Sequence, residues 1–203
     1  MPLLRKWFGP SKDEIWRLLS AEIGGNFVEG GFAHGAQVRA THGEWTVTLD
    51  SYVVSTGHAA AVYTRIRAPF VNPGGFRFTI YRRGLFSDIA KLLGMQDLEI
   101  GDPDFDRDFI IKSNDAARVR QLLSSGRVRE LITAQPQIYF TVKDDEGWFG
   151  ASFPEGVDEL YFLASGTITD LARLKALYEL FGETLTQLCS IGLAYCGDPK
   201  VAL

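Results

Sequence analysis

The sequence predicts an α+β domain in which an antiparallel β-sheet is covered by a long C-terminal helix. The helix is indicated by apolar residues that recur in steps of three and four between Ile168 and Tyr195. The sheet is indicated by the short alternating segments that fill much of the preceding chain. An apolar helix face of this length has to be buried, and a sheet is the surface that the rest of the chain offers. The apolar helix residues are Leu171, Leu174, Leu177, Phe181, Leu185 and Leu188.

Composition limits the class of protein. The chain has 203 residues, of which 46% are hydrophobic and 23% charged, and these values are typical of a packed globular domain. The net charge of −4 argues against a nucleic-acid partner and against an anionic membrane surface. No secretory signal follows Arg5 and Lys6, and no apolar run reaches the roughly 18 residues of a membrane span. We therefore expect a cytoplasmic protein.

The first half of the chain is expected to hold a helix, four strands and a short helix. Ser11 and Glu14 have the spacing of a capping box, and Gly24–Gly25 would end the helix that they begin. The last two strands are expected to pair with each other as a hairpin. The expected strands are Gln37–Thr41, Glu44–Val54, Ala60–Ala68 and Phe76–Arg82, and the short helix is Ser87–Leu93.

The second half repeats some of this pattern. The polar segment Leu98–Asp108 is expected to be a loop, and it is the best candidate for a boundary. The elements expected after it are a strand at Phe109–Lys112, a helix capped by Asn114 or Asp115, a helix at Arg127–Thr133, a hairpin of Gln137–Val142 with Gly147–Phe153, and a strand at Glu159–Ala164. We predict a single domain over 1–203, with two related subdomains at 11–97 and 105–196 as the alternative.

The expected hairpin at Ala60–Arg83 carries a concentration of positive charge. Between Arg65 and Lys91 there are six basic residues and one acidic residue. Symmetric pairing of the two strands would place Arg67 opposite Arg77, which is unfavourable unless an anion lies between them. This face is therefore a candidate for binding an anionic ligand, although neutralisation by the protein's own carboxylates is the simpler interpretation and the one we favour. The candidate ligand-binding residues are Tyr63, Arg65, Arg67, Arg77 and Tyr81.

A second candidate site consists of four alternating carboxylates, Asp102, Asp104, Asp106 and Asp108. Carboxylates at this spacing could converge on a hard cation, and one protonated acid among them could serve a hydrolase. The positions that an EF-hand reserves for Gly and Glu are occupied by other residues, whichever aspartate is counted first. A solvated loop is the simpler interpretation.

Other chemistry-bearing residues give weaker signals. The histidines His34, His42 and His58 all lie in turn-like sequence, and exposed turn residues are a better explanation for them than a zinc site. On one continuous helix Cys189 and Cys196 would be about 10 Å apart, too far for a disulfide, so we expect reduced thiols. The sequence contains no nucleophile elbow, phosphate-binding loop or dinucleotide-binding motif. We expect no cofactor.

The chain resembles an uncharacterised family of soluble bacterial proteins. The most specific part of the resemblance is Gly101–Pro103 followed by Phe105–Lys112, which reads Gly-Asp-Pro-x-Phe-Asp-Arg-x-Phe-Ile-Ile-Lys. The other segments that carry it are Glu22–Gly25, Trp45–Asp50, Tyr63–Arg65, Ala68–Phe70 and Gly84–Met95. The family has no known activity, so the resemblance implies a shared fold and a bacterial origin but no catalytic residues.

Taken together, these patterns favour a non-enzymatic binding module. Its partner would be a small apolar or anionic molecule or another protein. The alternative from a different class is a metal-dependent hydrolase that uses the aspartates of 102–108. A third hypothesis is an assembly role through an exposed sheet edge.

Overall fold

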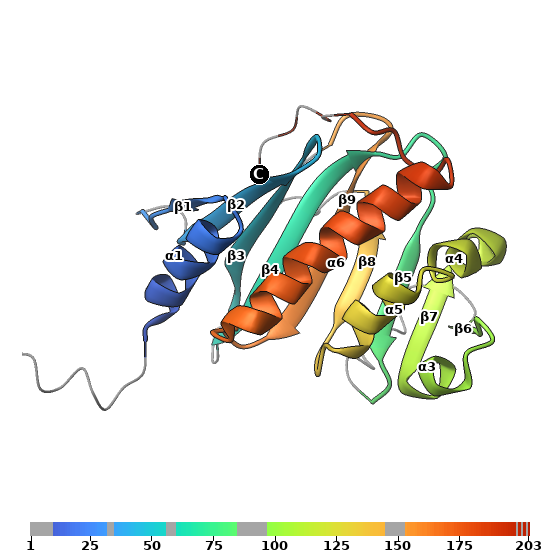
Figure 1. The fold of residues 1–203 in the computed structure, drawn as a ribbon, viewed down its shortest axis with the longest axis horizontal. Coiled ribbons are helices and arrows are strands. Elements are labelled where there is room, and N and C mark those ends of the chain that lie inside the picture. Colours follow the sequence, from blue (N-terminus) through green and yellow to red (C-terminus); the bar gives the residue numbers. More distant parts are fainter. Residues whose placement is uncertain are drawn as a thin grey trace, which may run out of the picture.

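The computed structural model describes residues 10–31, 35–55, 60–84, 97–144 and 153–197, together with 199, 201 and 203. Nine strands of this part form one antiparallel sheet in the order β1-β2-β3-β4-β9-β8-β5-β7-β6, and the helices lie on one of its faces (Figure 1). The expected α+β class is confirmed. The strands are β1 (Asn26–Val28), β2 (Gln37–His42), β3 (Trp45–Ser55), β4 (Ala60–Val71), β5 (Phe78–Arg82), β6 (Asp97–Leu98), β7 (Phe109–Ser113), β8 (Tyr139–Lys143) and β9 (Val157–Ser165), and the helices are α1 (Lys12–Glu22), α3 (Pro103–Asp108), α4 (Ala116–Leu122), α5 (Gly126–Thr133) and α6 (Leu171–Ser190).

Helix α6 lies across the sheet as its apolar stripe requires. Its side chains meet those of the central strands, and the ring of Phe181 packs edge-on against that of Phe140 in β8, with centroids 5.6 Å apart. Each fully buried Leu or Phe contributes about 1.5–3 kcal/mol relative to an exposed one. The helix is shorter than expected because Asp170 caps its first turn and Gly192, at φ 72°, turns the chain after its end.

A glycine in α6 permits close contact with the sheet. A Cβ atom at Gly182 would lie 2.5 Å from ring atoms of His42 at the end of β2. The His42 ring in turn stacks on Trp45, with centroids 6.5 Å apart. The absence of a side chain at position 182 therefore lets the helix pass over the turn between β2 and β3, where a larger residue would push it away.

The expected hairpin of β4 with β5 is wrong. Strand β4 lies between β3 and β9, and β5 lies between β8 and β7. The connection between them is organised by Asn72, whose side chain accepts from the Phe76 amide (3.1 Å) and donates to the Phe76 carbonyl (2.9 Å). A turn of this kind reverses the chain but does not determine which strand pairs with which. Strands β9 and β8, which come later in the sequence, lie between β4 and β5. One sheet therefore joins the ranges 11–97 and 105–196.

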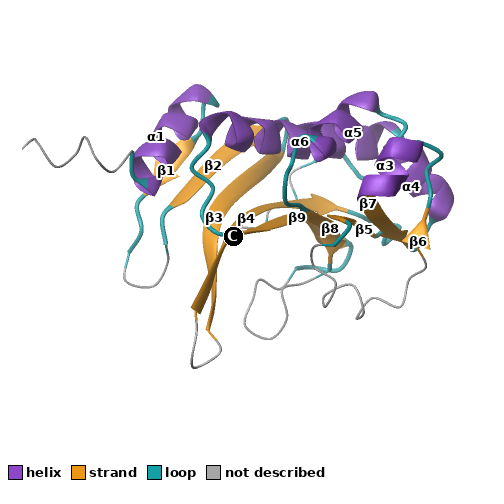
Figure 2. Cartoon of the chain, turned by 90° about the horizontal axis from the view of Figure 1, so that it is seen from below, coloured by secondary structure: helices purple, strands orange, loops and turns teal. Residues whose placement is uncertain are grey.

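The two faces of the sheet differ in character. The helix-covered face holds the main core, in which the indole of Trp16 from α1 donates to the carbonyl of Ile168 (3.2 Å). The opposite face carries a smaller buried cluster of aromatic and aliphatic residues. Figure 2 shows all the described helices on the same side of the sheet. The smaller cluster consists of Tyr81, Ile110, Tyr139, Tyr161 and Leu163, with Tyr63 partly buried against it.

Several local predictions are confirmed. The capping box of Ser11 with Glu14 begins α1, and Asp115 caps α4. The segment expected to be a loop at Leu98–Asp108 instead contains the short helix α3. The expected helix at Ser87–Leu93 and most of the strand at Gly147–Phe153 lie outside the described residues. Within the described part of the chain, none of the helices is both long enough and apolar enough to cross a membrane.

Candidate functional site

Two of the candidate arginines are bound to a carboxylate of the protein itself. Asp50 in β3 is directly opposite Arg65 in β4, and Arg67 lies two residues further along the same face. Arg65 donates to both oxygens of Asp50, from Nε to Oδ1 at 2.8 Å and from Nη2 to Oδ2 at 2.7 Å. Arg67 Nη2 donates to Oδ2 at 2.8 Å. All three side chains are largely buried, so these two arginines present little free charge to a ligand.

Arg77 lies apart from them and also has carboxylate neighbours. Its guanidinium is 2.9 Å from Asp144 and 3.5 Å from Asp158. Asp158 accepts a 2.5 Å hydrogen bond from the side chain of Asn72. Burial raises the pKa of Asp158, and this effect outweighs the opposing influence of Asn72 and Arg77. The guanidinium of Arg77, which directly precedes β5, thus lies beside a buried carboxyl group and favours its ionised form.

The candidate tyrosines belong to the smaller cluster on the helix-free face. Tyr81 is buried there, and Tyr63 packs against its edge. Burial raises the pKa of the neighbouring Tyr139, although hydrogen bonds with Thr79 and Thr141 act in the opposite direction. The structure therefore places Tyr63 near the bound arginines but separates Tyr81 from β4 by two intervening strands.

The four aspartates at 102–108 do not converge on one point. Asp102 caps α3 by accepting from the Phe105 amide (3.2 Å), and Asp106 accepts from the amides of Ile100 and Gly101 (both 2.9 Å). These two carboxylates thereby fix the start of the helix and the strand-to-helix turn before it. Because a helix separates successive side chains around its axis, carboxylates that would share one side of a strand point in several directions here.

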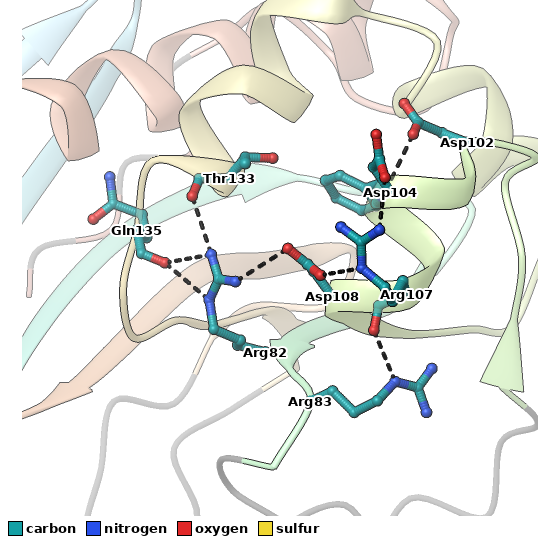
Figure 3. Close-up of polar contacts among 9 residues, drawn as sticks. Arg82, Arg83, Asp102, Asp104, Arg107, Asp108, Thr133 and Gln135 are labelled. Carbon is teal, nitrogen blue, oxygen red and sulfur yellow. Dashed lines mark hydrogen bonds and ion pairs between the residues drawn. The ribbon is translucent and has the colours of Figure 1, made fainter.

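The remaining two aspartates are paired with arginines (Figure 3). Arg107 Nη1 lies 2.7 Å from Asp104, and Arg107 Nε lies 3.1 Å from Asp108. Arg82 reaches Asp108 from the other side, at 3.5 Å. Among the described residues there is no group of three or more His, Cys, Asp or Glu side chains placed to hold a metal ion.

These aspartates instead border a cleft between α3 and α5. We call it the α3–α5 cleft; its volume is about 570 Å³, within the range of small-molecule sites. The stacked rings of Phe105 and Phe109, with centroids 4.6 Å apart, form its apolar base. Its lining residues are Asp102, Asp104, Phe105, Asp108, Phe109, Gly126, Arg129, Glu130, Thr133 and Ala134. The lining contains four carboxylates and one guanidinium, and each carboxylate is ion-paired: Asp102 with Arg129 (3.4 Å), Asp104 and Asp108 with Arg107, and Glu130 with Arg127 (2.8 Å).

Two adjacent arginines hold the walls of the α3–α5 cleft in place. Arg82 donates to the carbonyls of Thr133 (3.1 Å) and Gln135 (3.2 Å) at the end of α5, and its guanidinium lies 4.6 Å from the Phe109 ring centroid. Arg83 donates to the carbonyl oxygen of Arg107 (3.2 Å) at the end of α3. A cation at a helix C-terminus is favourable because the last carbonyls there carry partial negative charge. Figure 3 shows both contacts.

From the sequence, Arg82 and Arg83 are expected in the basic hairpin, and no individual role is predicted for them. Nothing local reveals their role, because the carbonyls that Arg82 binds come from about 50 residues later in the chain. The signal that was available is the Gly101–Asp108 segment itself: Pro103 follows a capping aspartate, and this combination favours a helix start.

The histidines and cysteines do not form a site in the described residues. His42 stacks on Trp45, and its Nε2 lies 3.4 Å from the Thr186 hydroxyl, whereas His34 and His58 lie outside the described ranges. The expected distance between the cysteines assumed one continuous helix, and this assumption is wrong because the chain turns back after Ser190. Both thiols are free, and burial together with a hydrogen bond to the Cys196 thiol raises the pKa of Cys189 to about 12.

Comparison with known proteins adds no assignment. No model of a known protein family matches the chain, and neither a curated protein nor a solved structure is significantly similar to it. The resemblance to a bacterial family therefore stays a prediction from the sequence, and the site has to be interpreted from its geometry.

Proposed function

We propose that this protein is a non-enzymatic binding domain whose ligand occupies the α3–α5 cleft. The observation that carries the proposal is the combination of a cavity of about 570 Å³, an aromatic base and several carboxylates in its lining. Ligand sites in proteins are concave, with apolar surface for affinity and a few polar groups for orientation. The α3–α5 cleft has both features, and its walls are held by hydrogen bonds from Arg82 and Arg83.

The preferred ligand is a molecule with an apolar portion and a positively charged group. The sequence favoured an apolar or anionic ligand because of the basic segment, but Arg65 and Arg67 are already bound to Asp50. The lining of the α3–α5 cleft instead carries carboxylates, among them Asp104 and Glu130, whose arginine partners Arg107 and Arg127 are exposed side chains outside the lining. An ammonium or guanidinium group would form charge-assisted hydrogen bonds with these oxygens.

The existing ion pairs at the rim leave room for such a ligand. The side chains of Asp104 and Arg107 are 86% and 67% exposed. An exposed pair of this kind contributes about 0–1 kcal/mol, because water competes for both charges. A ligand cation can therefore replace Arg107 as the partner of Asp104 without disturbing the fold.

The test compares two probes with the same aromatic body and opposite charge, phenethylamine and phenylacetate. We expect phenethylamine to shift the amide NMR signals of α3 and α5 in a saturable manner, and phenylacetate to leave them unchanged. Asp104→Asn combined with Glu130→Gln should weaken the phenethylamine response. The matched control is Glu29→Gln, which removes an exposed carboxylate paired with Arg17 outside the cleft. Equal responses to the two probes, or shifts located elsewhere in the molecule, would contradict the proposal.

A further inference from the structure

The β3–β4 hairpin extends beyond the rest of the sheet (Figure 2). We call the extended part, residues 51–55 and 60–62, the β3–β4 arm. Pairing of β2 with β3 ends at Val38 with Leu49, and pairing of β4 with β9 begins at Tyr63 with Ser165. Within the described residues, no third strand pairs with the arm, and its contacts with the rest of the protein are made at its base, where the Gly166 amide donates to the Val62 carbonyl (2.8 Å) and Lys12 Nζ donates to the Ser51 hydroxyl (3.4 Å).

The surface of the β3–β4 arm is unusually apolar for an exposed element. Tyr52, Val53 and Val54 are 40%, 56% and 36% exposed, and Val62 on the neighbouring strand is 41% exposed. None of the residues of the arm carries a charge. Four of the six exposed large hydrophobic side chains in the described part of the protein thus lie on this one ribbon.

Among the described residues, the arm also presents a strand edge with which no other strand pairs. The two outer strands of the sheet, β1 and β6, are only three and two residues long. Such shortening is a common protection against edge-to-edge association. The segment Ser51–Ser55, by contrast, has five residues without proline or charge, and every second backbone N–H and C=O along it is directed away from β4. A free edge of this kind is suited to pair with another β-strand.

We propose that Ser51–Ser55 pairs antiparallel with the same segment of a second copy of this chain, so that two sheets join into one across a two-fold axis. The segment is nearly palindromic: with Val53 opposite its symmetry mate, Ser51 is opposite Ser55 and Tyr52 is opposite Val54. Directly opposite residues point to the same face, so the two valines meet on one face and the Tyr–Val pairs meet on the other. A foreign strand would be selected by charge or by side-chain pockets, and the arm supplies no charge for that purpose. A two-fold contact between identical segments requires neither complementary charges nor side-chain pockets, because each copy presents the same surface to the other.

The test uses charge at the symmetry axis. Val53→Lys and Val53→Glu each place two like charges opposite each other, so each variant alone should weaken the dimer about tenfold or more. Mixed together, the two variants place Lys opposite Glu and should form a heterodimer. The control is Leu18→Lys on α1, which changes an equally exposed apolar residue (52%) outside the arm. Circular dichroism and melting curves verify that each variant is folded.

Sedimentation velocity over a concentration series provides the readout. Wild type and Leu18→Lys should reach twice the 22.5 kDa mass of one chain. The two Val53 variants should need at least about tenfold higher concentration to do so, and their equimolar mixture should dimerise at lower concentration than either variant alone. Hydrogen exchange of the 51–55 amides should slow with rising concentration in wild type and in Leu18→Lys, and in neither Val53 variant alone. A wild type that stays monomeric throughout, or Val53 variants that dimerise as wild type does, would overturn the proposal.

Discussion

Asp50 is expected to stabilise the fold by neutralising two arginines inside the sheet face. The substitution Asp50→Asn keeps the shape of the side chain and removes its charge. Three charge-assisted hydrogen bonds converge on this carboxylate, and the side chains of Asp50, Arg65 and Arg67 are only 7%, 12% and 6% exposed. Removing one member of a buried ion pair costs about 3–5 kcal/mol, because the remaining charge is left without compensation in a poorly solvated place.

We therefore expect Asp50→Asn to lower the free energy of unfolding by about 3–5 kcal/mol. With a urea dependence of about 2–3 kcal/mol per M, the unfolding midpoint should fall by about 1–2 M. Equilibrium unfolding followed by circular dichroism measures this difference. Glu29→Gln is the matched control: its partner Arg17 and Glu29 itself are 49% and 80% exposed, so its loss should not exceed about 1 kcal/mol.

A loss in Asp50→Asn no larger than that of the control would refute this reasoning. It would show that Arg65 and Arg67 do not depend on Asp50 for their charge balance. The hypothesis of an anion-binding face on β4 would then regain support, and phosphate or acetate binding to this face would be the next measurement.

Three further predictions concern other parts of the molecule. Gly182→Ala should lower the free energy of unfolding by about 1–3 kcal/mol, because the added methyl group collides with the His42 ring. In a His42→Ala background the same substitution should be neutral or stabilising, because alanine favours helix over glycine. Urea unfolding measures both effects, and equal effects in the two backgrounds would exclude the collision. Because the pKa of Asp158 is raised, the folded state binds this proton more tightly than the unfolded state does. The free energy of unfolding should therefore fall as pH rises from the ordinary pKa of 3.8 through the raised pKa of the folded state. Unfolding curves of Asp158→Asn measured across the same pH interval should lack this fall. Burial raises the pKa of Cys189 to about 12, whereas Cys196 is exposed. Iodoacetamide should therefore alkylate Cys196 in the folded protein and Cys189 only after unfolding. Intact-mass analysis measures the number of adducts, and two adducts formed at similar rates would contradict this prediction.

The elements that local sequence specifies were predictable. A capping box at Ser11, a capping aspartate at Asp115 and a 3.6-residue periodicity in the C-terminal segment act within a few residues, and the structure has a helix at each of these places. Alternation likewise placed most of β2, β3 and β4. The helix α3 was missed because the alternation of its aspartates was given more weight than the combination of Asp102 with Pro103 at its start.

The strand order and the site were not predictable by the same means. No pattern near Arg67 indicates that its neighbours are Thr48 and Tyr161, because such pairing depends on distant segments of the chain. The assignment of Arg67 and Arg77 to facing positions depended on the hairpin that the structure does not contain. The α3–α5 cleft arises from tertiary packing of two helices, and the sequence identified only its aspartates.

The position of β9 in the sheet has a consequence for how the chain folds. Thr64, at the edge that β9 covers, donates its hydroxyl hydrogen bond to Gly166, which lies 102 residues later. At ribosomal rates of about 5–20 residues per second, the edge of β4 waits about 5–20 s for its partner during synthesis. Contacts between residues this far apart in sequence slow folding, because the entropy of closing a long loop is lost before the stabilising contacts form. A chain that stops before Val157 lacks β9, so β4 and β5 belong to two separate groups of strands with unpaired edges. We therefore expect the domain to fold only after nearly all of it has left the ribosome. Two fragments divided near Gly101 are likewise expected to fold only when they are together.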